Sequence, residues 1–550
     1  MHPTRLVVLL LALAAPAVAA QERPSTRADT LRGSIGPERA WWDVLYYDLQ
    51  IRVSPADSTL AGSNTIHYLA TAPGRELQID LMAPLAVDSV VQNGARLTVR
   101  RDGNALFVRA AAPQEAGHRG TVTFHYHGRP RAAANAPWDG GLVWKRDPEG
   151  KPWVGSAVQG LGASAFWPNK DHQADEPDSM RIRITVPTPT VAISNGRFAG
   201  STRNADGTTT WDWRVRSPIN NYGVTINAGS YVHFGERFDG EAGPLDLDYW
   251  VLDAHLPQAR RQFAQVAPVL RCFESWFGPY PFYADGFKLV ESSYLGMEHQ
   301  SAVAYGNGFR NGYLGNDLSG TGLGLLWDYI IVHETAHEWF GNNITTKDIA
   351  DMWVHESFAM YAEGLYLECT EGKEAGARYL IGVRKQIANN APIVGPYGVN
   401  QEGSGDMYFK GANVLHTLRQ LAPNDAAWRA TLRGLNETFR HRTVTSREVE
   451  DYIAGRLGRD LGRVFDQYLR RARIPTLEYA VDGGTLRYRW RADVDGFDLP
   501  VRVTVAPDRY EWIAPETGAW NTMAVDLASA SDFRIDPAFY VEAAEVERPR

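Results

Sequence analysis

The chain of 550 residues is well above the size at which one hydrophobic core stops growing, so its length predicts about two to four domains. Hydrophobic residues make up 44% and charged residues 22%, which is typical of soluble globular proteins and excludes disordered and fibrous classes. The formal net charge of -8 lacks the basic excess that binding to a phosphate backbone requires. We therefore expect no nucleic-acid partner.

Residues 1–20 have the composition of a cleavable secretory signal. Met1 to Arg5 carry one positive charge, an apolar stretch runs from Leu6 to Ala15, and small residues close the segment. The apolar stretch is shorter than the roughly 20 residues that a membrane span needs, and no later stretch comes close to that length. We expect export to a periplasm or to the outside of the cell without a stable membrane span, with a membrane anchor as the alternative interpretation.

The two cysteines, Cys272 and Cys369, are far apart in the sequence. Export permits a disulfide, but two cysteines cannot form a stapled framework in a chain of this length. One disulfide and two buried thiols both stay open as interpretations.

The apolar pattern divides the rest of the chain into four parts. Residues 21–34 are polar without an apolar period and predict a flexible leader. Apolar residues alternate over residues 35–235, which is typical of half-buried antiparallel strands. Helical spacing dominates residues 236–472, and alternation returns over residues 473–545. We expect an N-terminal β-domain, a mainly helical domain and a small C-terminal β-domain.

Two helices of the middle part carry recognisable end signals. The stretch from Leu325 to Phe340 is predicted to be a helix, because Gly341 follows it where a left-handed cap is common. Thr445 and Glu448 have the spacing of a capping box that opens another helix.

His333 and His337 lie four residues apart on the first of these predicted helices. Two histidines at this spacing share one helical face, so both imidazoles can reach a single ion at the roughly 2.0–2.1 Å of a Zn–N bond. Glu334 projects from nearly the same side without needing to bind the metal. This placement suits a general base for the catalytic water.

A third ligand is available on a second predicted helix. A catalytic zinc site usually takes three protein ligands and leaves a fourth position for water. Glu356 follows His337 at nineteen positions, on a helix that can pack antiparallel to the first. Two histidines and this carboxylate predict one zinc ion per chain. His355 points to a different face and is interpreted as structural.

Residues 333 to 363 resemble the aminopeptidase N and leukotriene hydrolase family of zinc metallopeptidases, the gluzincin aminopeptidases. The similarity extends over roughly residues 40 to 470 in the family's order. The other stretches that carry it are Trp167-Pro168 with Asp175-Glu176-Pro177, Trp276 to Pro281, Leu295 to His299, and Tyr408 to Ala412.

The resemblance implies a multidomain α+β fold. Its expected parts are an N-terminal antiparallel β saddle-like domain, a thermolysin-like mainly helical catalytic domain and a small C-terminal β-sandwich domain. Many family members end in a large helical domain that covers the cleft. Here the residues after 472 alternate like strands, so we expect no C-terminal helical cap domain.

The resemblance also implies roles for residues outside the zinc site. It assigns stabilisation of the oxyanion to the phenol of Tyr408. It places Glu298 and Gln159 at the free α-ammonium of the substrate, with Gly296 and Met297 in the same substrate-binding motif. The implied function is a zinc-dependent aminopeptidase that removes N-terminal residues from peptides with a free N-terminus.

The chain departs from the family pattern at several positions. Leu295 replaces a usual Gly and His299 a usual Asn, while His355 and Ser357 flank the third ligand where Asn and Gly are more usual. A protonated His299 would lower the negative potential beside Glu298.

Three alternatives remain: a zinc endopeptidase, a catalytically silent peptide-binding protein on the same fold, and epoxide opening of the leukotriene hydrolase kind. The sequence does not reveal the preferred N-terminal residue or the oligomeric state.

Overall fold

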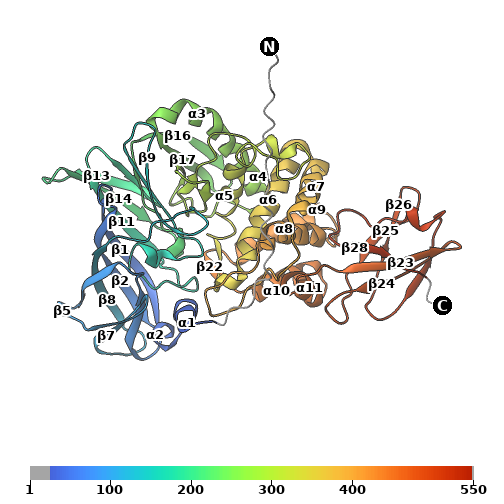
Figure 1. Ribbon diagram of the computed structural model, residues 1–550, viewed down its shortest axis with the longest axis horizontal. Coiled ribbons are helices and arrows are strands. Elements are labelled where there is room, and N and C mark those ends of the chain that lie inside the picture. Colours follow the sequence, from blue (N-terminus) through green and yellow to red (C-terminus); the bar gives the residue numbers. More distant parts are fainter. Residues whose placement is uncertain (1–24, 548–550) are drawn as a thin grey trace, which may run out of the picture.

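The computed structural model describes residues 25–547, so the predicted signal segment lies outside the described residues. Strands dominate the N-terminal part, helices the middle and strands again the C-terminal part (Figure 1). This order agrees with the expected α+β organisation.

An eight-stranded sheet forms the main layer of the N-terminal part. Its buried positions alternate along the strands, as at Tyr47, Leu49 and Ile51, because successive side chains point to opposite faces. The strands pair antiparallel except for β1 and β11, which run parallel, so the expectation of a purely antiparallel sheet was wrong at this pair. The strand order is β13 (Arg197–Arg203), β14 (Thr208–Val215), β11 (Ser179–Pro187), β1 (Trp42–Ser54), β2 (Thr59–Ala70), β8 (Arg119–Gly128), β4 (Ala86–Gln92), β5 (Ala95–Arg96).

Two smaller sheets complete this part and share one hydrophobic core with the large sheet. The three-stranded sheet has the order β3 (Gly74–Asp80), β7 (Ala105–Gln114), β6 (Val99–Asp102). The four-stranded sheet has the order β12 (Val191–Ile193), β15 (Asn227–Gly229), β10 (Pro152–Ala157), β9 (Gly141–Arg146).

The predicted flexible leader is wrong for residues 27–33. These residues form helix α1 (Arg27–Gly33), which Thr26 opens with a capping box, and a short helix α2 (Pro37–Ala40) follows. Arg32 forms an ion pair with Asp171 of the N-terminal part, with 3.1 Å between Nη2 and Oδ1. A polar sequence without an apolar period gave no signal for this helix, because it is held by an ion pair and a capping box and not by an apolar face.

The expected domain boundary at residue 235 falls inside strand β16 (Tyr231–Gly240). This strand alternates like those before it, but it pairs with β17 (Gly243–Leu252) in a sheet of the middle part. Alternation alone therefore could not show to which sheet the strand belongs. The five-stranded sheet has the order β16, β17, β18 (Phe287–Glu291), β20 (Val303–Tyr305), β19 (Gly296–Met297).

Helices form the remainder of the middle part and lie between the two strand-rich ends in Figure 1. Helix α6 is almost entirely buried and contacts α4, α5, α7 and α8, so it forms the centre of this part. The helices are α3 (Leu256–Gln262), α4 (Val266–Phe277), α5 (Tyr329–Ala336), α6 (Trp353–Glu371), α7 (Lys373–Gly382), α8 (Asp406–Arg419), α9 (Asp425–Thr438), α10 (Ser446–Leu457) and α11 (Gly462–Arg470). A parallel pair joins β21 (Ile344–Thr346) to β22 (Arg442–Val444).

Of the two predicted helix ends, one is confirmed. Helix α10 begins after Thr445 with a capping box to Glu448. Helix α5 is shorter than the predicted stretch from Leu325 to Phe340 at both ends. Asp328 caps its first turn by accepting from two backbone N–H groups, and the helix ends at Ala336 with His337 as its C-cap, so the predicted end at Phe340 was wrong.

A disulfide joins Cys272 of α4 to Cys369 of α6, with 6.1 Å between the Cα atoms. The bond resolves the choice that the sequence left open. It ties the central helix to the helix that packs beside it.

The C-terminal strands lie at the end of the molecule opposite the N-terminal sheets (Figure 1). Their buried residues, among them Leu477, Trp490 and Val501, belong to the same hydrophobic core as the middle helices. Within the described residues after 470, the helical structure consists of one short 3-10 turn, η8 (Ala530–Asp532). The strands are β23 (Thr476–Asp482), β24 (Thr485–Arg491), β27 (Asn521–Ala524) and β28 (Glu542–Glu545) in one sheet, and β25 (Val501–Ala506) with β26 (Arg509–Ile513) in another.

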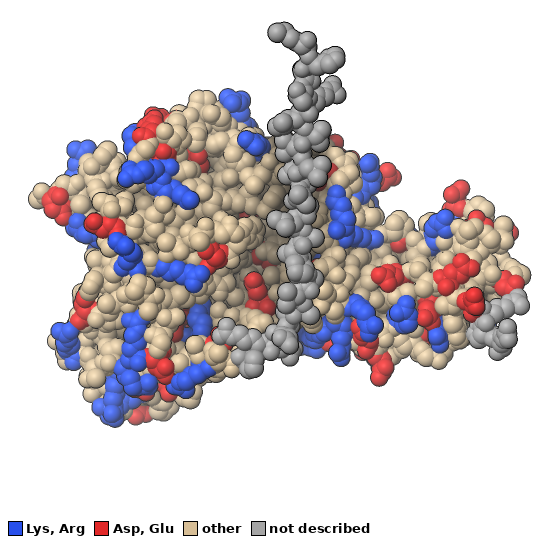
Figure 2. Space-filling model, viewed as in Figure 1, with Lys and Arg blue, Asp and Glu red and all other residues tan. Residues whose placement is uncertain are grey.

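Within residues 25–547 no helix combines the length and apolar character needed to cross a membrane. On the face shown in Figure 2, basic and acidic side chains are interspersed over the strand-rich parts at both ends.

Candidate metal and catalytic site

Helices α5 and α6 bring three potential metal ligands together. The two imidazoles of His333 and His337 and the carboxylate of Glu356 are buried, and their ligand atoms all lie within 4.8 Å of one another. His333 lies in the last turn of α5 and His337 is the C-cap of that helix, while Glu356 lies in the first turn of α6. The local spacing of four residues places the two rings on one face, and the packing of α6 on α5 supplies the carboxylate.

The three ligand atoms form a nearly equilateral triangle. The Nε2 atoms of the two histidines are 3.3 Å apart, and Oε2 of Glu356 lies 3.5 Å from Nε2 of His333 and 3.4 Å from Nε2 of His337. A tetrahedral ion with bonds of about 2.0–2.1 Å requires ligand separations of about 3.3–3.4 Å. Oε2 of Glu356 is also buried without a hydrogen-bond partner among the described residues. Donor type, spacing and this unpaired oxygen all fit a zinc ion.

Both histidines are oriented by bonds at their other ring nitrogen. Nδ1 of His333 lies 2.8 Å from Oε1 of Glu363, and Nδ1 of His337 lies 2.9 Å from the carbonyl oxygen of Phe340. The hydroxyl of Tyr379 donates to the second oxygen of Glu363 at 2.6 Å. Such contacts fix the tautomer that leaves Nε2 free for a metal.

Sequence reasoning did not identify Glu363 and Tyr379. The available signal was the position of Glu363, which follows Glu356 by two helical turns and therefore lies on the same face of α6. Tyr379 lies on the next helix and carries no such signal.

Glu334 lies at the edge of the same site. Burial raises the pKa of its carboxyl to about 7, against the opposing effect of the two neighbouring imidazoles. A group with a pKa near neutrality suits the transfer of a proton in either direction. Gly296 permits the carboxylate to approach, because a Cβ at this position would lie only 2.9 Å from Oε1 of Glu334.

Strand β19 places the predicted substrate-binding motif beside the metal ligands. Gly296 and Met297 form this strand, and the buried carboxylate of Glu298 follows it. The amide nitrogen of Gln159 donates to Glu298 at 2.7 Å and to Glu356 at 2.8 Å. The structure thus joins an amine-binding candidate from the N-terminal part to the metal site. Burial raises the pKa of Glu298, and a cationic group bound beside the carboxyl would oppose this shift by stabilising the ionised form.

Tyr408, in the first turn of α8, lies with its ring 6.2 Å from the ring of His333. The side chain is half-buried and therefore partly accessible to solvent. Burial and the carboxylates of Glu356, Glu402 and Glu298 raise its pKa well above the ordinary value. The phenol is therefore a neutral hydrogen-bond donor at physiological pH.

The unusual histidines of the two motifs are neutral. Burial lowers the pKa of His299 to about 3 and that of His355 also to about 3. His299 therefore does not reduce the negative potential beside Glu298. His355 accepts from the backbone N–H of Thr346 at 2.9 Å, and its ring stacks on Tyr222. Its predicted structural role agrees with these contacts.

Comparison with known protein families gives one match. Residues 263–468 match the Peptidase family M1 domain. This range contains the metal ligands, Glu334, Glu298 and Tyr408.

Curated relatives match the chain at low identity. "Probable aminopeptidase 1" of Saccharolobus solfataricus is 22% identical over 358 residues, 62% of this chain and 44% of the relative. "Tricorn protease-interacting factor F2" of Thermoplasma acidophilum is 19% identical over 459 residues, 80% of this chain and 55% of the relative. The chain spans about half or less of the length of the curated relatives it matches.

Among solved structures, the M1 zinc metallopeptidase from Deinococcus radiodurans is similar over 81% of this chain and 98% of its own, with a TM-score of 0.66 and 23% identity. A structure of a mutant of that enzyme bound to the peptide Tyr-Ser-Ala gives a TM-score of 0.67 over 80% of this chain and 97% of its own, at 24% identity. These similarities show a shared two-domain fold, with a β-rich N-terminal domain and a helical catalytic region. The expected resemblance is confirmed at the levels of family and fold.

Proposed function

Since residues 263–468 form a peptidase family M1 domain, we propose that this chain is a zinc aminopeptidase that removes single residues from the N-terminus of peptides. The observation that carries the proposal is the triangle of His333, His337 and Glu356 next to the Gln159–Glu298 pair. A hydrolytic centre and an anchor for an ammonium group lie side by side.

The metal site defines where hydrolysis takes place. His333, His337 and Glu356 would hold one zinc ion, which matches the donor set of known catalytic zinc sites. Zinc, when bound, supplies Lewis acidity that makes water a better nucleophile at neutral pH and polarises the substrate carbonyl.

The protein's own groups perform the proton transfers. Glu334 takes a proton from the attacking water on its carboxylate and later delivers that proton to the leaving amine. The hydroxyl of Tyr408 donates a hydrogen bond to the carbonyl oxygen as negative charge develops there. Because the donor is already in place and neutral, it stabilises the transition state without rearrangement.

The Gln159–Glu298 pair explains why the enzyme would cut one residue from the end. The carboxylate of Glu298 accepts hydrogen bonds from the substrate's α-ammonium, and the amide oxygen of Gln159 supplies a further acceptor. An internal peptide segment has no ammonium and would leave the buried carboxylate unpaired, so it is disfavoured.

The setting of the enzyme is part of the proposal. The signal-like composition of residues 1–20 and the disulfide between Cys272 and Cys369 support an exported protein, in a periplasm or outside the cell. We assign the strands after residue 473 to a small C-terminal β-sandwich domain and the N-terminal sheets to a saddle-like domain. We propose the three domains 35–235, 236–472 and 473–545 as the sequence predicted them, except that the first boundary lies at the start of β16.

The proposal is tested with aminoacyl fluorogenic substrates and matched N-acetylated peptides, with and without a chelator. Activity is expected on free N-termini alone, to vanish with the chelator and to return with added zinc. The variant Glu334→Gln should lose about 10²–10⁴-fold in kcat. Equal cleavage of acetylated peptides would favour an endopeptidase, and activity that survives both the chelator and Glu334→Gln would refute the mechanism.

A further inference from the structure

The side chain of Gln159 reaches from the N-terminal part into the metal site, and its backbone lies in a turn. The backbone N–H of Gly162 donates to the carbonyl oxygen of Val158 at 2.8 Å, which closes the turn of residues 158–162, the Gln159 turn. Strand β10 precedes this turn, and the 3-10 turn η1 (Ala163–Ala165) follows it. The position of the Gln159 turn therefore determines where the amide of Gln159 lies in the metal site.

The loop of residues 393–404, the 393–404 loop, precedes helix α8 in the middle part. The hydroxyl of Tyr397 donates to Asp351 at 2.7 Å, and the backbone N–H of Gly398 donates to Asp348 at 2.8 Å. These bonds fix the 393–404 loop to the segment that precedes α6.

Asn400, on the 393–404 loop, holds the Gln159 turn directly. Its amide nitrogen donates to the carbonyl oxygen of Gly160 at 3.2 Å, and Gly160 directly follows Gln159. The backbone of Asn400 is left-handed, with a φ of 47°, a conformation that asparagine adopts more readily than most residues. The same backbone packs against Gly33 of α1, where an added Cβ would lie 2.0 Å from the nitrogen of Asn400. Asn400 thus joins α1, the 393–404 loop and the Gln159 turn.

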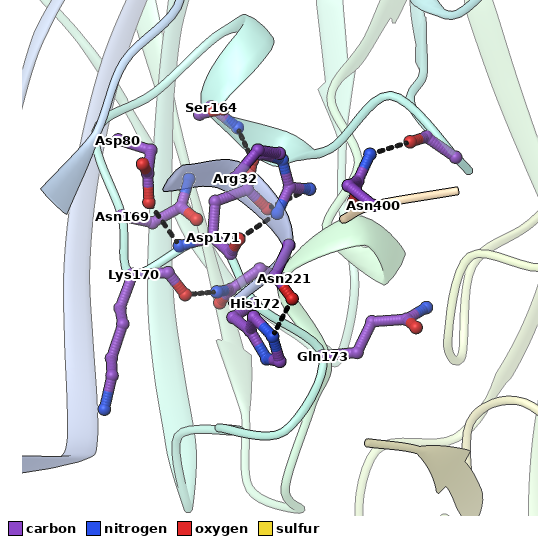
Figure 3. Close-up of polar contacts among 12 residues, drawn as sticks. Arg32, Asp80, Ser164, Asn169, Lys170, Asp171, His172, Gln173, Asn221 and Asn400 are labelled. Atoms are coloured by element: carbon purple, nitrogen blue, oxygen red, sulfur yellow. Dashed lines mark hydrogen bonds and ion pairs between the residues drawn. The ribbon is translucent and has the colours of Figure 1, made fainter. Parts of the chain in front are cut away.

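Helix α1 holds the other end of the Gln159 turn through Asp171. Arg32 of α1 forms an ion pair with the carboxylate of Asp171 and also donates to its carbonyl oxygen. The second carboxylate oxygen of Asp171 accepts from the backbone N–H of Ser164, in η1, at 2.9 Å. Gly162 makes room for the ion pair, because a Cβ there would collide with the guanidinium of Arg32. Figure 3 shows this chain of contacts with Asn400 beside it.

The space between Arg32 and Asn400 is too small for a peptide. A cavity of about 20 Å³ lies between them, lined also by Gly160 and Asp171, and it has room for about one water molecule. The charge of Arg32 is already paired with Asp171. The two side chains therefore act on the backbone around Gln159 and not on a ligand of their own.

We propose that Arg32 and Asn400 are positioning residues of the amine-binding site, which hold Gln159 where its amide oxygen meets the substrate's α-ammonium. The inference rests on the proposed aminopeptidase function and extends it to residues that do not touch the substrate. A polar group that is fixed before the substrate binds loses less conformational entropy on binding than a mobile one. Arg32 and Asn400 therefore raise the affinity for the ammonium by holding the Gln159 turn in place.

The test uses a pair of zinc-binding inhibitors that differ only in the α-amine, leucine hydroxamate and the hydroxamate of 4-methylpentanoic acid. Their inhibition constants are measured on the zinc-loaded full-length mature protein with leucyl-aminomethylcoumarin as the substrate. The ratio of the constants, the amine preference, reports on the amine-binding site alone, because the metal contacts and the leucyl side chain are common to both inhibitors.

The amine preference should fall in each variant that removes or loosens Gln159. Gln159→Ala should lower it at least about tenfold, because a hydrogen bond to a charged group is lost. Arg32→Met and Asn400→Gly should each lower it at least about threefold, because Gln159 stays present but is no longer held. Glycine keeps the left-handed backbone at residue 400 and removes the donor alone.

Arg27→Met is the matched control, because Arg27 lies on the same helix and pairs with Asp102 at 2.8 Å on the exposed surface. Its amine preference should stay within about twofold of wild type, since exposed ion pairs contribute little. Arg32→Lys should keep part of the preference, because lysine can still pair with Asp171. In the Gln159→Ala background, Arg32→Met should lower the preference no further, because a positioning residue acts only through the side chain that it positions.

Each result decides for or against one of the two proposals. An amine preference within about twofold of wild type in both Arg32→Met and Asn400→Gly overturns the inference and leaves the aminopeptidase function intact. A wild-type preference in Gln159→Ala, or an equal effect of Arg32→Met with and without Gln159, also overturns the inference. A wild-type protein that does not hydrolyse the leucyl substrate with zinc overturns the proposed function, and the inference falls with it. Zinc content and thermal unfolding of each variant confirm that folded proteins are being compared.

Discussion

The hydroxyl of Tyr408 stays protonated because burial and nearby carboxylates raise its pKa, so the residue acts through a hydrogen bond and not through charge. Substitution with phenylalanine keeps the ring against His333 and removes the donor alone. Loss of one preorganised oxyanion donor typically costs about 10²–10³-fold in kcat, and we expect Tyr408→Phe to fall in this range with little change in KM.

Steady-state kinetics on a leucyl substrate measure this effect. Tyr510→Phe, an exposed tyrosine of β26, is the matched control and should behave like wild type. A Tyr408→Phe enzyme with wild-type kcat and a raised KM would assign the tyrosine to ground-state binding instead.

The sequence predicted the metal ligands because their geometry is largely local. Four residues of helix bring His333 and His337 together, and a single further carboxylate on the next helix completes the set. The bond from Gln159 to Glu356 joins residues 197 positions apart, across two domains. No periodicity encodes such a contact, and only the family resemblance pointed to Gln159.

Helix α1 shows what sequence patterns miss at the scale of elements. Alternation indicated the strand-rich residues 35–235 and 473–545, because strands such as β1 and β11 bury one face. Helix α1 is fixed instead by the Arg32–Asp171 pair and by close packing of Gly33 on the 393–404 loop. Such contacts become visible only when distant segments are placed side by side (Figure 3).

Gly33→Ala tests the packing of α1. A Cβ at residue 33 would lie 2.0 Å from the backbone nitrogen of Asn400, so either the helix or the loop must move. We expect overpacking to lower the free energy of unfolding by about 1–3 kcal/mol and to increase cleavage within the 393–404 loop under limited proteolysis. Gly36→Ala is the control, since the nearest atom to its Cβ is a flexible Glu38 oxygen at 3.6 Å. Identical unfolding and proteolysis of the two variants would contradict this account of α1.

The disulfide between α4 and α6 gives a second prediction at the scale of secondary-structure elements. It closes a sequence separation of 97 residues between α4 and α6, which restricts the unfolded chain. Replacing both Cys272 and Cys369 by serine should lower the free energy of unfolding by about 2–4 kcal/mol. Urea unfolding measures the loss. The stability of the serine variant should not change with reductant, and reduced wild type should be about as stable as the variant. If reductant does not change the stability of the wild-type protein, the two sulfurs are not bonded.

Stability of the whole molecule should depend on pH through buried histidines. Burial lowers the pKa of His172, His299 and His416 from 6.5 to about 3 in the folded protein. Because the folded pKa lies below the unfolded value, the unfolded chain binds more protons between these limits. The stabilisation is complete above about pH 6.5 and is lost as the pH falls toward about 3.

His416→Gln isolates one of these groups, in the last turn of α8. As the pH falls from about 6 to about 4, the free energy of unfolding should decrease less in the variant than in wild type. The reason is that the variant takes up one fewer proton when it unfolds. Urea unfolding at several pH values measures the slope. Parallel pH profiles for the two proteins would show that His416 is not buried in its neutral form.

The metal content of the purified protein after equilibrium dialysis against zinc tests the central claim most directly. Three proteins are compared: wild type, Glu334→Gln and His337→Ala. We predict about one zinc per chain in wild type and in Glu334→Gln, and almost none in His337→Ala, because three ligands are needed to hold the ion. Wild-type protein without bound transition metal, or a His337→Ala variant that retains a full equivalent, would contradict the assignment of this site.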